Sequence, residues 1–85
     1  LINRFIQARN NYYTAYDTYQ TSRENMELAK RVYERISKKY SEGMAGSMEL
    51  TQANRDYLNA ESEYISTLVE LLNTRTELDK ILNEL

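Results

Sequence analysis

Apolar side chains recur every seven residues along the first half of the chain. Two series run side by side there, spaced alternately by three and four residues. The bulkier series is Phe5, Tyr12, Tyr19, Met26, Tyr33 and Tyr40, and the smaller series is Ala8, Ala15, Ser22, Ala29 and Ile36. This spacing is typical of a coiled coil, in which one stripe of a helix packs against a partner helix. We therefore expect a helix over about residues 2–41, with left-handed supercoiling because the repeat has no interruption.

The second half repeats the same design. Its bulkier series is Leu50, Tyr57, Tyr64, Leu71, Leu78 and Leu85, and its smaller series is Ala53, Ala60, Thr67, Thr74 and Ile81. A second helix over about residues 47–83 follows from this pattern. Folding the chain about residue 45 matches the two seams, pairing Tyr40 with Leu50, Tyr33 with Tyr57, Met26 with Tyr64 and Tyr19 with Leu71. The predicted fold is all-α, a single antiparallel two-helix coiled-coil hairpin.

The two helical patterns are separated by a short segment over residues 42–46. It holds both glycines of the chain, Gly43 and Gly46. Gly43 can adopt the left-handed conformation that ends many helices, and Gly46 or Ser47 can cap the start of the next one. Glu49 would then lie near the positive end of the second helix dipole. This segment is predicted to reverse the chain.

Further apolar residues lie beside both seams. They are Leu58, Ile65, Leu68, Val69, Leu72 and Leu82 in the second half, and Ile6, Tyr13 and Tyr16 in the first. One partner helix cannot cover both this set and the seam. Small chains also rarely bury enough area alone. We therefore expect the hairpin to associate with itself, most simply as a dimer that forms a four-helix bundle.

Composition excludes several functions. Cys, His and Pro are absent, so thiolate or imidazole metal sites, disulfides and Cys–His or Ser–His nucleophiles are excluded. No pattern buries a pair of acids as general acid–base catalysis would need, so we expect neither an enzyme nor a cofactor. No apolar run approaches the ~20 residues of a membrane-spanning helix, so the hairpin itself is not expected to insert into a bilayer.

Basic residues cluster near the end of the first helix. They are Lys30, Arg31, Arg35, Lys38 and Lys39. Glu27 and Glu34 stand at helical spacing to Arg31 and Lys38, where opposite charges pair. The chain as a whole is acidic, with a formal net charge of -2. A solvated helix face is therefore expected rather than a nucleic-acid surface.

Met44 and Met48 are two flexible apolar side chains at the predicted turn. Apolar side chains exposed at a turn are unfavourable in water, and methionine adapts well to contact surfaces. The turn is therefore a candidate interaction tip.

The residues around the turn also carry a family resemblance. Lys39-Tyr40, Gly43, Glu49-Leu50 and Ala53, followed by residues 58–64 and 71–78, resemble the second repeat of TolC-type outer membrane efflux proteins. Chains of that family are several times longer and contain strands that cross the outer membrane. The resemblance therefore implies that this hairpin is a fragment, the periplasmic portion of an outer membrane protein.

The resemblance implies a function for the tip. In that family a trimer forms a twelve-helix periplasmic barrel, and its helix-turn-helix tips meet a periplasmic adaptor protein to complete a tripartite efflux or secretion pump. The implied docking and entrance residues are Lys39, Tyr40, Gly43, Met44, Ala45, Gly46, Met48, Glu49 and Gln52. Ala45 and Gln52 replace a basic residue and a second acid found in some members. A charge-locked entrance is therefore not implied, whereas docking is.

Two other interpretations remain open from the residues. The chain could be a dimeric structural coiled coil that spaces other domains, and strand-poor flanking sequence would favour this. It could also be the hairpin of the adaptor itself, which is a long antiparallel coiled coil in the same pumps. The Arg-Leu-Ser docking pattern expected of an adaptor is not found around Gly43, which makes the adaptor the weaker alternative.

Overall fold

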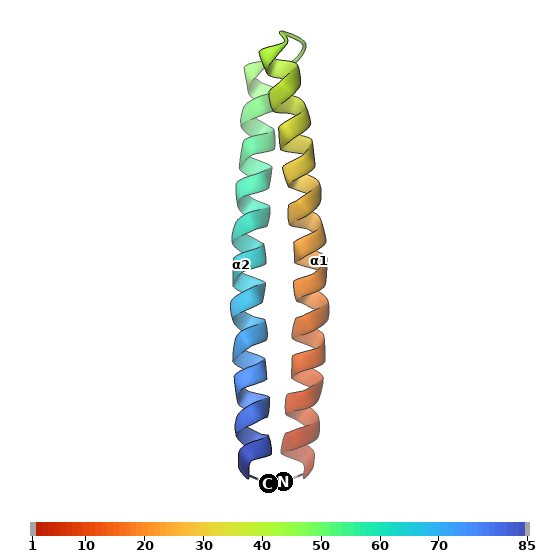
Figure 1. The fold of residues 1–85 in the computed structure, drawn as a ribbon, viewed down its shortest axis with the longest axis vertical. Coiled ribbons are helices and arrows are strands. Elements are labelled where there is room, and N and C mark those ends of the chain that lie inside the picture. The colour runs from red at the N-terminus through yellow and green to blue at the C-terminus, as the bar shows by residue number, and fades with distance from the viewer. Residues whose placement is uncertain (1, 85) are drawn as a thin grey trace.

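The computed structural model describes residues 2–84, which form two long helices joined by a short turn. Helix α1 spans Ile2–Ser41 and helix α2 spans Ser47–Glu84. They lie side by side and antiparallel, with both termini at the end opposite the turn (Figure 1). The hairpin is a rod of 63 × 14 × 13 Å, as expected for helices of this length at about 1.5 Å per residue. The predicted all-α antiparallel hairpin is confirmed.

The core of the hairpin follows the smaller heptad series. Its buried residues are Ala8, Ala15 and Ser22 on α1 and Ala53 and Ile81 on α2, all at most 7% exposed. Small side chains let the two helix backbones approach, while the longer tyrosines of the other series extend over the edge of the seam and, except for the exposed Tyr40, stay half-buried. Among the described residues no large side chain is completely buried. The core is therefore thin along the whole rod.

The register between the helices agrees with folding about residue 45. The rings of Tyr33 and Tyr57 stack with their centroids 5.8 Å apart, which confirms the predicted pairing. Ser22 and Thr67 hydrogen bond through their hydroxyls at the middle of the rod. The Tyr19 ring also lies 5.5 Å from that of Tyr64, a contact in addition to the predicted pairings. The small Ser22–Thr67 pair leaves room for the two long rings to meet along the seam.

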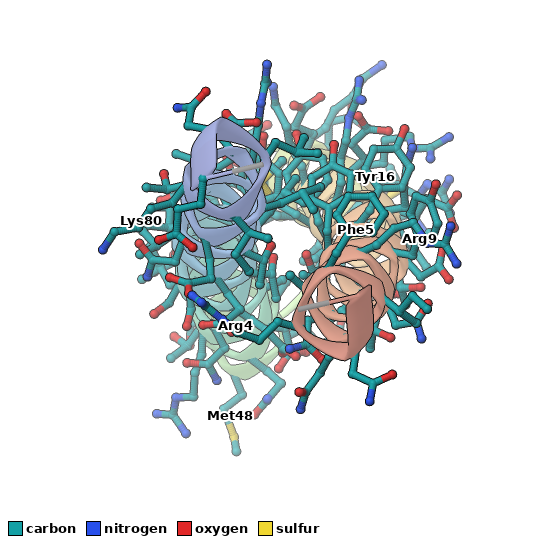
Figure 2. The ribbon with its side chains drawn as sticks, turned by 90° about the horizontal axis from the view of Figure 1, so that it is seen from below. Arg4, Phe5, Arg9, Tyr16, Met48 and Lys80 are labelled. Atoms are coloured by element: carbon teal, nitrogen blue, oxygen red, sulfur yellow. The ribbon has the colours of Figure 1, made fainter. Side chains whose placement is uncertain are left out.

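The two sides of the hairpin differ in chemistry. On one side lies the apolar face, which we define as Ile6, Tyr13 and Tyr16 of α1 with Leu58, Ile65, Leu72 and Leu82 of α2, each 39–56% exposed. These residues share two adjacent heptad positions, so they line one edge of the seam. Figure 2, viewed along the rod, shows Tyr16 and Arg4 on opposite sides of the helix pair. The opposite edge carries mainly Asn, Thr and Glu.

Candidate docking tip

The turn is built from a complete helix-ending motif. The Met44 amide donates to the Lys39 carbonyl at 2.8 Å and the Gly43 amide to the Tyr40 carbonyl at 3.0 Å. These are the two hydrogen bonds of a Schellman motif, in which Gly43 occupies the left-handed position. Gly43 has φ of 77°, the only positive φ among residues 2–84. The last carbonyls of α1 are thus satisfied, and the chain leaves the helix in a defined direction.

Helix α2 begins directly after this motif. The Gly46 carbonyl accepts the Leu50 amide at 3.2 Å, which makes Gly46 the capping residue, one of the two alternatives that the sequence left open. Its φ is not in the left-handed region, and a Cβ placed there would meet no atom within 4 Å. The two glycines therefore differ, because only Gly43 needs to be glycine for conformational reasons. Glu49 lies in the first turn of α2, where its charge favours the positive end of the dipole.

The two tip methionines are the most exposed large apolar side chains of the described residues. Met44 is 67% exposed and Met48 is 86% exposed. In Figure 2 the Met48 side chain projects away from the helix pair. In a Schellman motif an apolar residue at the Lys39 position often covers the residue at the Met44 position. Because Lys39 is charged, the motif supplies no such apolar partner for Met44.

The other predicted tip residues have distinct environments. Tyr40 is 45% exposed, and Ala45, within the turn, is half-buried. The Gln52 amide donates to the Asp56 carboxylate at 2.9 Å, so its side chain is partly occupied within α2. A shallow groove of about 250 Å³ runs along this part of α2, lined by Ser47, Met48, Thr51, Gln52 and Arg55. Met48 thus stands beside a polar hollow on the outer surface.

A cluster of hydroxyls at mid-rod was not singled out by the sequence. The Tyr19 and Tyr64 hydroxyls lie 3.3 Å apart, and the Ser22 and Thr67 hydroxyls pair beside them. Each of these two hydroxyls also lies 2.9 Å from the carbonyl three residues earlier. Since each has a single proton, one hydroxyl donates to its carbonyl and the other donates across the seam. The hydrogen bond to Tyr64, followed by partial burial, raises the pKa of Tyr19 above its usual 10.0, against the opposing charge of Arg23. One feature of the sequence could have indicated this cluster: Ser22 and Thr67 are polar residues at matching positions of the otherwise small and mainly apolar series.

The basic residues of α1 lie on an exposed helix surface. Glu27 pairs with Arg23 at 3.3 Å rather than with Arg31, as the spacing had suggested, while Arg31 donates to the Glu27 carbonyl at 3.5 Å. The basic residues from Lys30 to Lys39 are exposed on the helix surface. Within residues 2–84 there is no group of His, Cys, Asp and Glu side chains suited to hold a metal ion. In the same range no helix combines the length and apolarity needed to cross a membrane.

Comparison with known proteins decides the family. The family model described as "Outer membrane efflux protein" matches residues 1–84, nearly the entire chain. The chain belongs to the outer membrane efflux protein family. Neither the curated proteins nor the solved structures gave a significant match.

Membership of the outer membrane efflux protein family gives the hairpin a context. The family consists of channel and transport proteins of the outer membrane that have periplasmic helical parts, and its members are not enzymes. The chain is therefore a component of an outer membrane efflux channel. The family resemblance drawn from residues 39–53 is confirmed, and the long helical hairpin agrees with the helical parts of these proteins.

Proposed function

We propose that this hairpin is part of the periplasmic helical barrel of a trimeric efflux channel, and that its tip docks a periplasmic adaptor protein of a tripartite pump. One observation supports docking above the others. Met44 and Met48 are largely exposed on a turn whose backbone is held by the hydrogen bonds from Met44 and Gly43. Two apolar side chains on a rigid turn form a pre-organised contact surface.

The charges around the methionines suit a protein interface. Lys39 and Glu42 are exposed on one side of Met44, and Glu49 is exposed next to Met48. An apolar centre with a charged and polar rim is the usual composition of a protein–protein contact. Methionine side chains repack at low cost, which suits a tip that meets an adaptor together with other tips. The proposed docking residues are therefore Lys39, Tyr40, Gly43, Met44, Ala45, Gly46, Met48, Glu49 and Gln52.

The docking role can be tested in the full-length protein. The double variant Met44→Gln/Met48→Gln keeps side-chain length and helix propensity but removes the apolar contact. We expect drug or metabolite export to fall, together with an about tenfold loss of adaptor crosslinking from a photoreactive group at Ser47. The matched control is Leu28→Gln, because Leu28 is also exposed, at 57%, but lies in α1 well before the turn. The control should leave both export and crosslinking unchanged.

One result would contradict adaptor docking by the tip. If the double variant reaches normal levels in the outer membrane and keeps full export and crosslinking, the turn is a connector and not a docking surface. The hairpin would then serve the channel only through its helices.

A further inference from the structure

The sulfur atoms of the chain are concentrated at the turn. Cysteine is absent and there are three methionines, so Met26, Met44 and Met48 carry the only oxidisable sulfur. Met26 belongs to the bulkier series of α1 and is half-buried in the seam. Met44 and Met48 are instead 67% and 86% exposed, on either side of Gly46. An oxidant must reach the sulfur to react with it, so the two tip residues are the accessible sites.

We propose that Met44 and Met48 are reversible oxidation sites, at which hydrogen peroxide switches the tip from an apolar to a polar surface. The thioether sulfur donates an electron pair to one oxygen of the peroxide, so that an S–O bond forms as the O–O bond breaks. The second oxygen takes up the proton of the transferred oxygen and leaves as water. The sulfur is oxidised by two electrons to the sulfoxide, and the peroxide is reduced to water.

The surroundings of Met48 favour this reaction. Its side chain projects away from the helix pair (Figure 2), so peroxide has an open approach to the sulfur. The shallow groove of about 250 Å³ beside it includes Ser47 and Thr51 in its lining. Hydroxyl groups can donate hydrogen bonds to an oxygen that gains negative charge as the O–O bond breaks. We therefore expect Met48 to react faster than Met44.

The turn can be oxidised without losing its fold. The Met44 amide donates to the Lys39 carbonyl and the Gly43 amide to the Tyr40 carbonyl, and neither hydrogen bond involves a sulfur atom. A sulfoxide oxygen on an exposed side chain stays in water, so the free tip has no desolvation penalty. The half-buried Met26 differs, because a sulfoxide there would place a polar group in the thin seam. Oxidation at the tip therefore changes the surface and leaves the helices intact.

The consequence for binding rests on the docking function proposed above. An adaptor that covers the tip buries two apolar methionine side chains, whereas the oxidised tip would bury two polar oxygens in their place. A buried oxygen without a partner is unfavourable, so the oxidised tip should bind the adaptor at least about tenfold more weakly. Methionine sulfoxide reductases restore the thioether, which makes the loss of docking reversible. The tip thereby couples assembly of the pump to peroxide.

The first test measures the oxidation sites without an adaptor. The full-length protein, folded in membranes that lack the adaptor, is treated briefly with hydrogen peroxide, digested and analysed by mass spectrometry. Met44 and Met48 should be oxidised at least about threefold faster than Met26, with Met48 the fastest. The matched control is the same protein unfolded in guanidinium chloride, in which the three rates should become similar. Oxidation of Met26 as fast as the tip residues in the folded protein would overturn the assignment of the sites.

The second test measures the effect of oxidation on docking. The full-length protein with the photoreactive group at Ser47 is treated with hydrogen peroxide, which is then removed with catalase before the adaptor is added. Crosslinking should fall about tenfold, and methionine sulfoxide reductases A and B should restore it. The matched control is Met44→Leu/Met48→Leu, which keeps apolar side chains at both positions but has no sulfur at the tip. This variant should keep full crosslinking after the same treatment.

Failure of the oxidation switch can be distinguished from failure of docking. The switch is overturned if wild-type protein with oxidised Met44 and Met48 keeps full crosslinking, or if the leucine variant loses crosslinking equally. Docking is tested separately by the untreated Met44→Gln/Met48→Gln variant. If that variant loses crosslinking while the oxidised wild-type protein does not, docking stands and only the switch fails. If it keeps full crosslinking, docking fails and the switch fails with it.

Discussion

At the scale of single residues, the two glycines of the turn illustrate how position decides what a residue must be. Gly43 holds φ of 77°, a conformation in which a side chain costs roughly 1–2 kcal/mol. Gly46 has an ordinary φ and open space where a side chain would stand. Both glycines mark the turn in the sequence, but only the backbone geometry distinguishes the required glycine from the replaceable one.

The same substitution at both glycines should therefore act in opposite directions. Gly43→Ser is expected to lower the free energy of unfolding by about 1–2 kcal/mol because of its left-handed backbone. Gly46→Ser is expected to leave it unchanged or to raise it by a few tenths of a kcal/mol, because a serine hydroxyl can cap α2. Urea denaturation followed by circular dichroism measures both values. Equal losses in the two variants would show that the glycines serve a shared role that backbone conformation does not explain.

At the scale of the elements, the seam sets the pairing of α1 and α2, and the hydroxyls at mid-rod add a polar requirement to it. Ser22 is 4% exposed, and its hydroxyl meets that of Thr67 across the seam. A buried hydroxyl is costly unless it has a partner. A shift of one helix along the other would separate Ser22 from Thr67 and set each against a different side chain. Each hydroxyl would still reach the carbonyl three residues earlier in its own helix, so the pair favours this register by the added contact across the seam.

The coupling between Ser22 and Thr67 can be measured by a double-mutant cycle. Ser22→Ala and Thr67→Val should each lower the free energy of unfolding by about 1 kcal/mol. The double variant should lose less than the sum, because neither hydroxyl is then left without its partner. Thr18→Val is the control, since Thr18 is exposed and donates only within α1, to the Thr14 carbonyl. Strict additivity in the cycle would show that the hydroxyl contact contributes nothing to pairing.

At the scale of the whole molecule, the hairpin is a long rod with a thin core and one apolar side. A core built mainly from alanines buries little apolar area, and each Å² of such area contributes only about 25 cal/mol. A second hairpin on the apolar face would add larger side chains such as Ile65 and Leu72 to the buried set. We therefore expect stability and association to be linked.

This linkage predicts a melting temperature that depends on protein concentration. If folding and dimerisation are coupled, each tenfold rise in concentration should raise the melting temperature of the 85-residue chain by about 4 °C. Thermal melts followed by circular dichroism over a hundredfold concentration range check this. The variant Ile65→Gln/Leu72→Gln should melt at a lower temperature and lose the dependence. A wild-type melting temperature independent of concentration would mean that a single hairpin is stable on its own.

The sequence by itself determined the helical hairpin, its register and its turn. A strict seven-residue repeat is a local property of the helix, and matching two such repeats about the glycines leaves a single good alignment, so Tyr33 and Tyr57 could be paired in advance. The family resemblance at residues 39–53 likewise required only the order of side chains. Met44 and Met48 could be named as tip residues because they stand beside the two glycines that mark the turn.

Only the tertiary structure decided which contacts the long side chains make. The Tyr19 ring meets that of Tyr64, a contact that the heptad pairing did not predict, because ring placement depends on rotamers and on the space left by Ser22 and Thr67. The structure also decided between Gly46 and Ser47 as the cap of α2, and it confirmed the left-handed conformation expected of Gly43. The pairing of Glu27 with Arg23 rather than Arg31 has the same origin, because several partners lie within reach of one exposed carboxylate and the spacing alone does not rank them.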